Sequence, residues 1–115
     1  MGRHLIIDAY GVEKKKLTNK KFLTQFLENL PKELNMRIVR KPVVNKIFSD
    51  KYPCTGFSGF VIIYESHISF HTWPEKTYIA LDVYSCNDFN EKRAIKYIRR
   101  YFDVSNMKIK SIMRG

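Results

Sequence analysis

Two amphipathic helical patterns, separated by a long β-rich stretch, constrain the fold of this 115-residue chain most strongly. One pattern follows a helix cap at Thr18 or Asn19, and the other follows a cap at Asn90. The apolar residues that recur at helical spacing are Phe22, Leu23, Phe26, Leu27 and Leu30, then Ala94, Ile95, Ile98, Tyr101 and Phe102. A chain of this length is expected to form one domain, residues 1–115.

Strands are expected before, between and after the two helices. The predicted strands are 3–10, 36–48 with an interruption near Pro42, 57–64, 67–73, 77–84, and a last one through Met107, Ile109 and Ile112. Segment 49–56 is predicted to be a loop, and Pro31 is expected to end or tighten the first helix. The order β-α-β-β-β-β-α-β predicts an α+β fold, a two-layer α/β sandwich in which a mostly antiparallel sheet carries both helices on one face.

Charge and composition narrow the classes of function. The net charge is +10, from 21 Lys and Arg against 11 Asp and Glu, and the run Lys14–Lys16 is the best support for nucleic-acid binding. Most lysines, however, fall on helix starts and faces, and no RNA-binding or helix-turn-helix signature is present. We therefore expect a solvated basic surface and no nucleic-acid partner. No apolar run is long enough for a membrane span and no signal peptide opens the chain, so a soluble cytoplasmic protein without a membrane partner is expected.

The two cysteines and the histidines suggest no metal centre. Cys54 and Cys86 form neither a CxxC nor a zinc pattern, so both are expected to be free thiols, and one of them is a candidate catalytic thiol. His67 and His71 have a spacing that suits metal on a helix, but they fall in a predicted strand and lack an obvious third ligand. A serine-hydrolase interpretation is weak because no GxSxG elbow is present.

The segment from Glu65 to Glu75 carries the most chemistry. We interpret Glu65–Ser66 as a peptide bond that the chain breaks itself, with Ser66 as the nucleophile and His71 as the base. If the two central strands pair as a hairpin, Ser58 could donate a hydrogen bond to the oxyanion. A Ser–His pair on a strand is more often structural, so these residues alone leave both interpretations open.

A family resemblance bears on that choice. Residues 65–75, Glu-Ser-His-Ile-Ser-Phe-His-Thr-Trp-Pro-Glu, resemble the ESHxSxHTWPE signature of the small prokaryotic S-adenosylmethionine decarboxylases, which are pyruvoyl enzymes of polyamine (spermidine) synthesis. Residues 2–8 with Tyr10-Gly11 are similar to the family's start, 56–59 to its G-x-[ST]-G, and 81–86 to its D-x-[FY]-[ST]-C. The resemblance implies a self-processing, pyruvoyl-dependent carboxy-lyase cut between residues 65 and 66.

The resemblance also implies roles for individual residues. Ser66 would become the covalent pyruvoyl group, whose ketone forms a Schiff base with the substrate amine and acts as an electron sink. Ser58 and His71 would assist processing, and Cys86 would return a proton to the substrate. Glu75 would bind ribose hydroxyls, and the backbone at Ile68 would touch adenine. The family likeness further implies a homodimer of cleaved protomers, with each active site completed by the neighbouring subunit.

The segment 48–56 departs from the family pattern, which has a short Phe-x-Pro-x-Gly stretch there. Phe48 or Tyr52 is the candidate for stacking on adenine. Because related pyruvoyl enzymes act on ornithine or arginine with altered pockets, those substrates remain an alternative to S-adenosylmethionine. All three substrates are cations, so the positive chain favours none of them. Recognition must be local, through aromatic rings and carboxylates such as Glu75 and Asp82.

Overall fold

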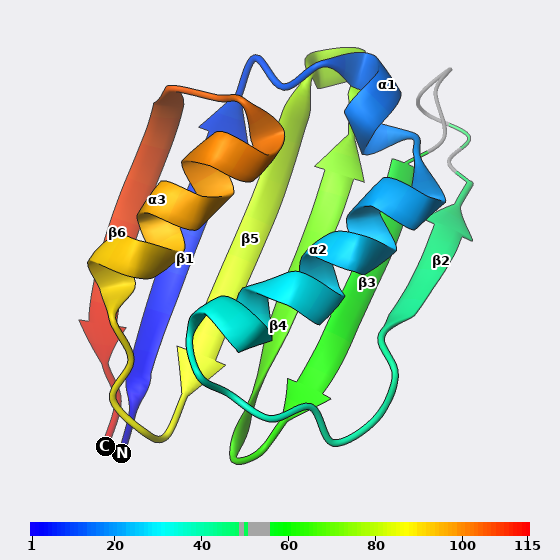
Figure 1. The fold of residues 1–115 in the computed structure, drawn as a ribbon. Helices are drawn as coiled ribbons and strands as arrows, with labels where there is room; N and C mark the ends of the chain where they lie inside the picture. Colours follow the sequence, from blue (N-terminus) through cyan, green and yellow to red (C-terminus); the bar gives the residue numbers. More distant parts are fainter. Residues whose placement is uncertain (49, 51–55) are drawn as a thin grey trace.

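In the computed structural model, which describes residues 1–48, 50 and 56–115, a six-stranded antiparallel sheet forms one layer and helices form the other. Figure 1 shows the two long helices, α2 (Lys20–Glu33) and α3 (Glu91–Phe102), on the same face of this sheet. The predicted two-layer α+β sandwich with both helices on one face is therefore confirmed.

The strands pair in the order β2-β3-β4-β5-β1-β6, so the first strand lies in the interior of the sheet. Their bounds are β1 Arg3–Tyr10, β2 Val43–Ile47, β3 Gly56–Ile63, β4 Ser66–Trp73, β5 Tyr78–Ser85 and β6 Asn106–Met113. Each predicted strand is present. The second is shorter than the expected 36–48, because before Pro42 only an isolated bridge between Ile38 and Ile63 forms. Most of the predicted loop 49–56 lies outside the described residues.

Asparagine caps begin both long helices, as the sequence predicts. The Asn19 side chain accepts a hydrogen bond from the Phe22 N–H at 3.0 Å, and Asn90 accepts one from the Arg93 N–H at 3.0 Å. Pro31 does not end the first helix, since α2 continues to Glu33. It lies close enough to the C-terminal end that the missing proline N–H removes a single bond of the last turns.

The core lies between the sheet and the helices. Phe26 of α2, Phe102 of α3 and Phe70 of β4 are fully buried there. At the helix–helix contact, the Tyr101 hydroxyl donates to the Phe22 carbonyl at 2.6 Å, and burial raises the pKa of Tyr101 to about 12. Burial of this apolar layer orients every strand, because alternate side chains must face the helices.

Two short helices complete the set of described elements. They are α1 (Lys14–Leu17) and the 3₁₀ helix η1 (Pro74–Lys76), and Figure 1 shows both at the upper end of the sheet. The Thr72 hydroxyl fixes this end, since it donates to the Leu17 carbonyl at 3.1 Å and accepts from the Phe57 N–H at 2.9 Å. Over the described ranges, no helix is both long and apolar enough to cross a membrane.

Candidate active site

One face of the sheet packs on the helices, and the opposite face, which we call the outer face, holds most of the polar side chains of the strands. Strand alternation creates this division: Ile68, Phe70 and Thr72 of β4 are buried, whereas His67, Ser69 and His71 are not. The outer face carries His4, Asp8 and Tyr10 of β1, Tyr78, Asp82 and Tyr84 of β5, and His67, Ser69 and His71 of β4.

Ser66 begins β4 directly after a tight turn. Residues 64 and 65 form that turn, and Ile63 pairs with Ser66 across the hairpin. Glu65 has a φ of 73°, in the left-handed region that a residue with a side chain adopts at a cost of about 1 kcal/mol. The Glu65–Ser66 peptide bond therefore follows a strained residue, and strain of this kind is concentrated at functional sites.

The end of β5 places Cys86 against Ser66. Ser66 pairs with Ser85 in the sheet, and the next residue donates its backbone N–H to the Ser66 Oγ, with a Cys86 N to Ser66 Oγ distance of 2.8 Å. The Asn87 N–H donates to the buried Ser85 Oγ at 3.1 Å, which fixes the chain after the strand. Cys86 is an exposed free thiol. The structure thus brings together the predicted nucleophile and the predicted proton donor, which are 20 residues apart.

Ser58 and His71 form a second centre at the other end of the same strands. They are register partners on β3 and β4, and the Ser58 Oγ lies 2.6 Å from the His71 Nδ1. An open hollow of about 200 Å³ on the outer face is lined by both residues together with Ile47 and Phe60. The contact between Ser58 and His71 was not among the predictions.

These two centres are separate within one chain. His71 lies five residues along β4 from Ser66, and extended chain of that length spans about 17 Å. The two side chains also alternate to opposite faces of the strand. The hairpin forms as expected, but it sets Ser58 opposite His71 rather than opposite Ser66, so Ser58 cannot donate to an oxyanion formed at Glu65 of its own chain.

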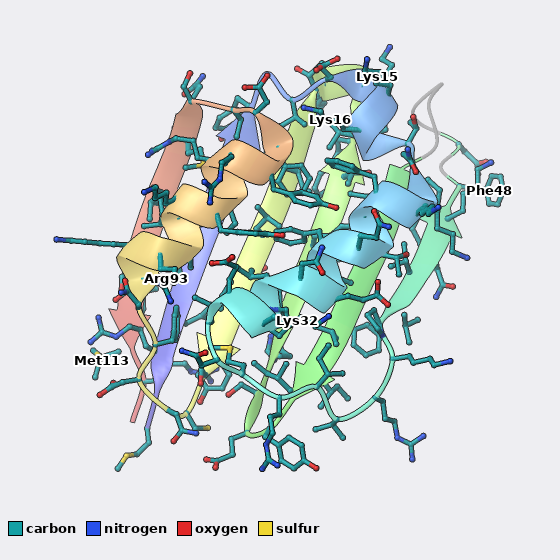
Figure 2. All side chains as sticks on the ribbon, in the orientation of Figure 1. Lys15, Lys16, Lys32, Phe48, Arg93 and Met113 are labelled. Atoms are coloured by element: carbon teal, nitrogen blue, oxygen red, sulfur yellow. The ribbon has the colours of Figure 1, made fainter. Side chains whose placement is uncertain are left out.

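The other predicted residues lie away from Ser66. Glu75 is in η1 at the upper end, and its Oε1 is buried with no hydrogen-bond partner among the described residues. Figure 2 shows Phe48 at the free edge beyond β2, where 79% of it is exposed. Tyr52 and Cys54 lie outside the described residues. Ile68 is fully buried in a strand paired on both sides, so its contact with adenine stays a prediction.

The sequence did not predict that polar side chains of three strands form a row beside Cys86. His67, Tyr84 and His4 are register partners across β4, β5 and β1, and the His4 Nε2 lies 2.9 Å from the Asp82 Oδ1. Alternation on the three strands is the signal that could have found them. The pairing of β1 with β5, which joins residues 68 to 82 positions apart, has no local signature.

The two histidines of β4 are too far apart to bind one metal ion. Four residues of extended strand separate His67 from His71 by about 13 Å, whereas ligands of one zinc ion each lie about 2 Å from it. Within the described part of the chain, no group of three or more His, Cys, Asp or Glu side chains is placed to hold a metal ion.

Comparison with known proteins gives a consistent result. The family model described as S-adenosylmethionine decarboxylase matches residues 3–115. An S-adenosylmethionine decarboxylase proenzyme of Clostridium botulinum (strain Langeland) is 36% identical over 115 residues, which cover 99% of this chain and 94% of that protein. One of Clostridium kluyveri is 34% identical over 100% of this chain and 87% of that protein. The crystal structure of the adenosylmethionine decarboxylase from Aquifex aeolicus VF5 superposes with a TM-score of 0.84 at 30% identity, over 100% of this chain and 91% of that one.

Proposed function

The chain belongs to the S-adenosylmethionine decarboxylase family, and we propose that it is made as a precursor which cleaves itself between Glu65 and Ser66 and then decarboxylates S-adenosylmethionine. The observation that carries the proposal is the family match over residues 3–115, combined with the left-handed conformation of Glu65 before Ser66 and a free thiol on the residue that hydrogen-bonds Ser66. The same comparisons favour S-adenosylmethionine over ornithine or arginine, because the relatives are all named for it.

Self-cleavage begins at the Ser66 hydroxyl. Its oxygen attacks the Glu65 carbonyl carbon, the peptide C–N bond breaks, and an ester joins residue 65 to the Ser66 side chain. A base then removes the Ser66 α-proton, and Glu65 leaves as the new C-terminal carboxylate. Water hydrolyses the resulting dehydroalanine to a pyruvoyl group and releases ammonia. Cleavage also frees Glu65 from its left-handed conformation, which favours the forward direction by about 1 kcal/mol.

The base and the oxyanion donor come from a second copy of the chain. Because Ser58 and His71 are about 17 Å along the sheet from Ser66, they cannot act on their own protomer. In the proposed dimer the outer faces of two protomers pack against each other. The two-fold axis lies between them and is perpendicular to the strands, so the upper end of one sheet faces the lower end of the other. The Ser58–His71 pair of one protomer then lies over the Ser66 end of the other, and each dimer has two complete sites.

An exposed apolar patch on the outer face supports this arrangement. Val43 and Ile47 of β2 and Phe60 and Ile62 of β3 are between 41% and 46% exposed and lie on adjacent strands. Side chains of this kind are rarely left clustered in water, and they suit the centre of an isologous interface. The patch borders the Ser58–His71 hollow, so one contact would both bury apolar surface and complete the site.

The residues around position 66 fit a pyruvoyl group. The group forms from a serine, and Ser66 follows a left-handed Glu65 and is hydrogen-bonded by the backbone of Cys86, the residue that carries a free thiol. When formed, the group provides a carbonyl that condenses with the substrate amine and accepts the electron pair released as CO₂ leaves. Cys86 then gives its thiol proton to the substrate α-carbon, keeps the S–H electron pair as a thiolate, and regains a proton from solvent. A reducing compartment such as the cytoplasm suits a reaction that needs a free thiol.

Substrate recognition is assigned to groups that can attract a cation locally. The Glu75 Oε1 is buried and has no hydrogen-bond partner among the described residues, and an unsatisfied buried acceptor costs about 1–3 kcal/mol. A ribose hydroxyl that donates a hydrogen bond to this oxygen would remove that cost. Asp82 presents a second carboxylate on the outer face, although His4 already contacts it. Phe48 and Tyr52 are the candidates for stacking on adenine.

Release of CO₂ from carboxyl-labelled substrates tests the proposal. The purified protein should release CO₂ from S-adenosylmethionine and not from ornithine or arginine. The Ser66→Ala variant is the matched control, since it lacks only the hydroxyl from which the group forms. Release from ornithine or arginine alone would replace the proposed substrate, and no release from any of the three would remove the enzyme assignment.

A further inference from the structure

Tyr84 places a phenol hydroxyl beside the Cys86 thiol. The two residues lie on the same side of the chain at the end of β5, and the Tyr84 hydroxyl oxygen is 3.8 Å from the Cys86 Sγ. The same hydroxyl donates to the Met1 carbonyl oxygen at 3.1 Å. Tyr84 therefore joins the proposed proton donor to the first residue of the chain.

Three side chains hold the Tyr84 ring in this position. His4 of β1 meets the ring edge-on at a centroid distance of 5.9 Å, and His67 of β4 lies on the other side at 5.8 Å. The Arg114 guanidinium carbon lies 4.9 Å from the ring centroid. Figure 1 shows the two chain termini together at the lower edge of the sheet, the edge where β5 ends. These contacts come from β1, β4 and the C-terminal segment, so the ring cannot move far.

The hydrogen-bond inventory fixes the direction of both contacts. A carbonyl oxygen only accepts, so the single phenol proton of Tyr84 points to Met1. With the phenol proton on Met1, the Cys86 S–H donates to the Tyr84 oxygen, and this contact orients the thiol. Rotation about the C–O bond turns the same phenol proton from Met1 to the sulfur.

The phenol keeps its proton over the working range. A hydrogen bond donated by the Tyr84 hydroxyl to Cys86 and, after it, burial raise the pKa of Tyr84, while Arg114 lowers it by less. At neutral pH the group is therefore a hydroxyl, able to accept from a thiol and to donate to a thiolate.

We propose that Tyr84 is a positioning residue that holds the Cys86 thiol as a proton donor and stabilises the thiolate left after the proton is given. This inference rests on the proposed role of Cys86. Before transfer, Cys86 S–H donates to the Tyr84 oxygen. After the proton has moved to the substrate carbon, the sulfur holds the electron pair, and the Tyr84 O–H rotates from Met1 to donate to it. Because O–H···S⁻ is charge-assisted, it is the stronger of the two contacts.

Alkylation of Cys86 by iodoacetamide tests the contact directly. The Tyr84→Phe variant keeps the ring and removes only the hydroxyl, and peptide mass spectrometry separates Cys86 from Cys54. In the full-length Ser66→Ala precursor, Tyr84→Phe should slow Cys86 alkylation at pH 7 about fivefold, as expected for the loss of one hydrogen bond. At strongly alkaline pH, where thiols are ionised, the two rates should converge, which separates loss of the hydrogen bond from loss of access.

Tyr78→Phe is the matched control. It removes a phenol from the same face of the same strand, where the hydroxyl donates to the Asp8 Oδ1 at 2.5 Å instead of meeting a thiol. Cys86 alkylation should be unchanged in it. In the processed protein, Tyr84→Phe should lower kcat for S-adenosylmethionine and leave KM unchanged.

Equal alkylation rates with and without the Tyr84 hydroxyl at pH 7 would overturn the inference, and so would an unchanged kcat in processed Tyr84→Phe. The proposed function and the proposed role of Tyr84 can fail separately. If the wild-type protein releases no CO₂ from S-adenosylmethionine, the proposed function fails. Alkylation of the precursor still decides whether Tyr84 controls the thiol.

Discussion

Cys86 combines two groups at one residue, a backbone N–H that binds the Ser66 oxygen and a thiol that faces solvent. The amide holds the end of β4 in place, and the thiol remains available to a substrate bound there. In this account, cleavage needs Ser66, while turnover needs the Cys86 side chain. The two roles can therefore be separated by mutation.

Replacement of Cys86 by alanine keeps the backbone donor and removes the thiol. We expect the variant to be cleaved at residue 66 to the same extent as wild type, but to turn over S-adenosylmethionine about 10²-fold or more slowly, the usual contribution of a general acid. Denaturing gels measure the cleavage and CO₂ release measures the turnover. Normal turnover in the variant would exclude Cys86 as the proton donor.

Residue types were the predictable part of the site. The nucleophile, the base, the thiol and the substrate carboxylate could each be assigned from residues 58–86 and the family motif. The sequence could not predict which of these residues lie together, because residues a few positions apart on an extended strand are far apart in space. His71 is five positions from Ser66 yet lies in another centre. Cys86 is 20 positions from Ser66, and its backbone N–H donates a hydrogen bond to the Ser66 oxygen.

At the level of elements, each long helix depends on a local cap. The Asn90 side chain accepts a hydrogen bond from the Arg93 N–H, one of the backbone donors in the first turn of α3 that have no partner within the helix. We expect Asn90→Ala to lower the free energy of unfolding by about 1 kcal/mol. Urea denaturation of the Ser66→Ala precursor measures the effect on an intact chain. Asn90→Ser is the control, since its hydroxyl can replace the amide oxygen, and an equal loss in both variants would reject the cap as the cause.

An ion pair joins Glu91, in the first turn of α3, to Arg3 at the start of β1. Burial raises the pKa of this carboxyl, but hydrogen bonds from Ser111 and Arg3 and the charge of Arg3 outweigh it, so the pKa is lowered overall. A carboxyl with a lowered folded-state pKa stabilises the fold above its unfolded value of about 4.3, and this stabilisation is lost as the pH falls through the folded value.

Glu91→Gln should therefore destabilise the precursor at pH 7 and lose most of that effect near pH 3. Urea denaturation at the two pH values measures the difference. Glu13→Gln, which removes an exposed ion pair with Lys15, should have little effect at either pH. A deficit in Glu91→Gln that is the same at pH 3 and pH 7 would show that the contact acts by packing rather than by charge.

The sequence predicts the helices and strands whose pattern is contained in a short stretch of neighbouring residues. The caps and the helical spacing of α2 and α3, and the alternation of β4 and β5, are all carried within a dozen residues. The insertion of β1 between β5 and β6 depends on contacts made late in the chain. The four-residue helix α1 has one buried side chain, Leu17, and is too short for a period to appear.

At the level of the whole molecule, the division of the site predicts complementation between inactive variants. Ser66→Ala lacks the nucleophile and His71→Ala lacks the base, so each should remain uncut alone. When the two are mixed, unfolded and refolded together, mixed dimers contain one intact site, in which the Ser66→Ala chain supplies His71 to the other. Cleavage of the His71→Ala chain alone is expected. No cleavage in mixed dimers, shown by differently tagged chains, would contradict the shared site.

The charge of the molecule fits this arrangement. Figure 2 shows Lys15, Lys16, Lys32 and Arg93 on the helices that cover one face of the sheet. The proposed site uses the opposite face, where Asp8 and Asp82 supply negative charge next to the aromatic rings of Tyr78 and Tyr84. Lys108 and Arg114 lie over the rings of Tyr10 and Tyr84 on this face, so Asp8, Asp82 and the Tyr78 ring are the groups that can attract a cationic substrate.

The intact mass of the purified wild-type protein, compared with Ser66→Ala, tests the central claim most directly. The account predicts two chains, residues 1–65 and 66–115, with the second lighter by one ammonia than its serine-initiated sequence and reactive toward a hydrazide probe. Ser66→Ala should give one uncut chain. A wild-type protein that is also a single chain with serine at position 66 and no reactive carbonyl would contradict the account.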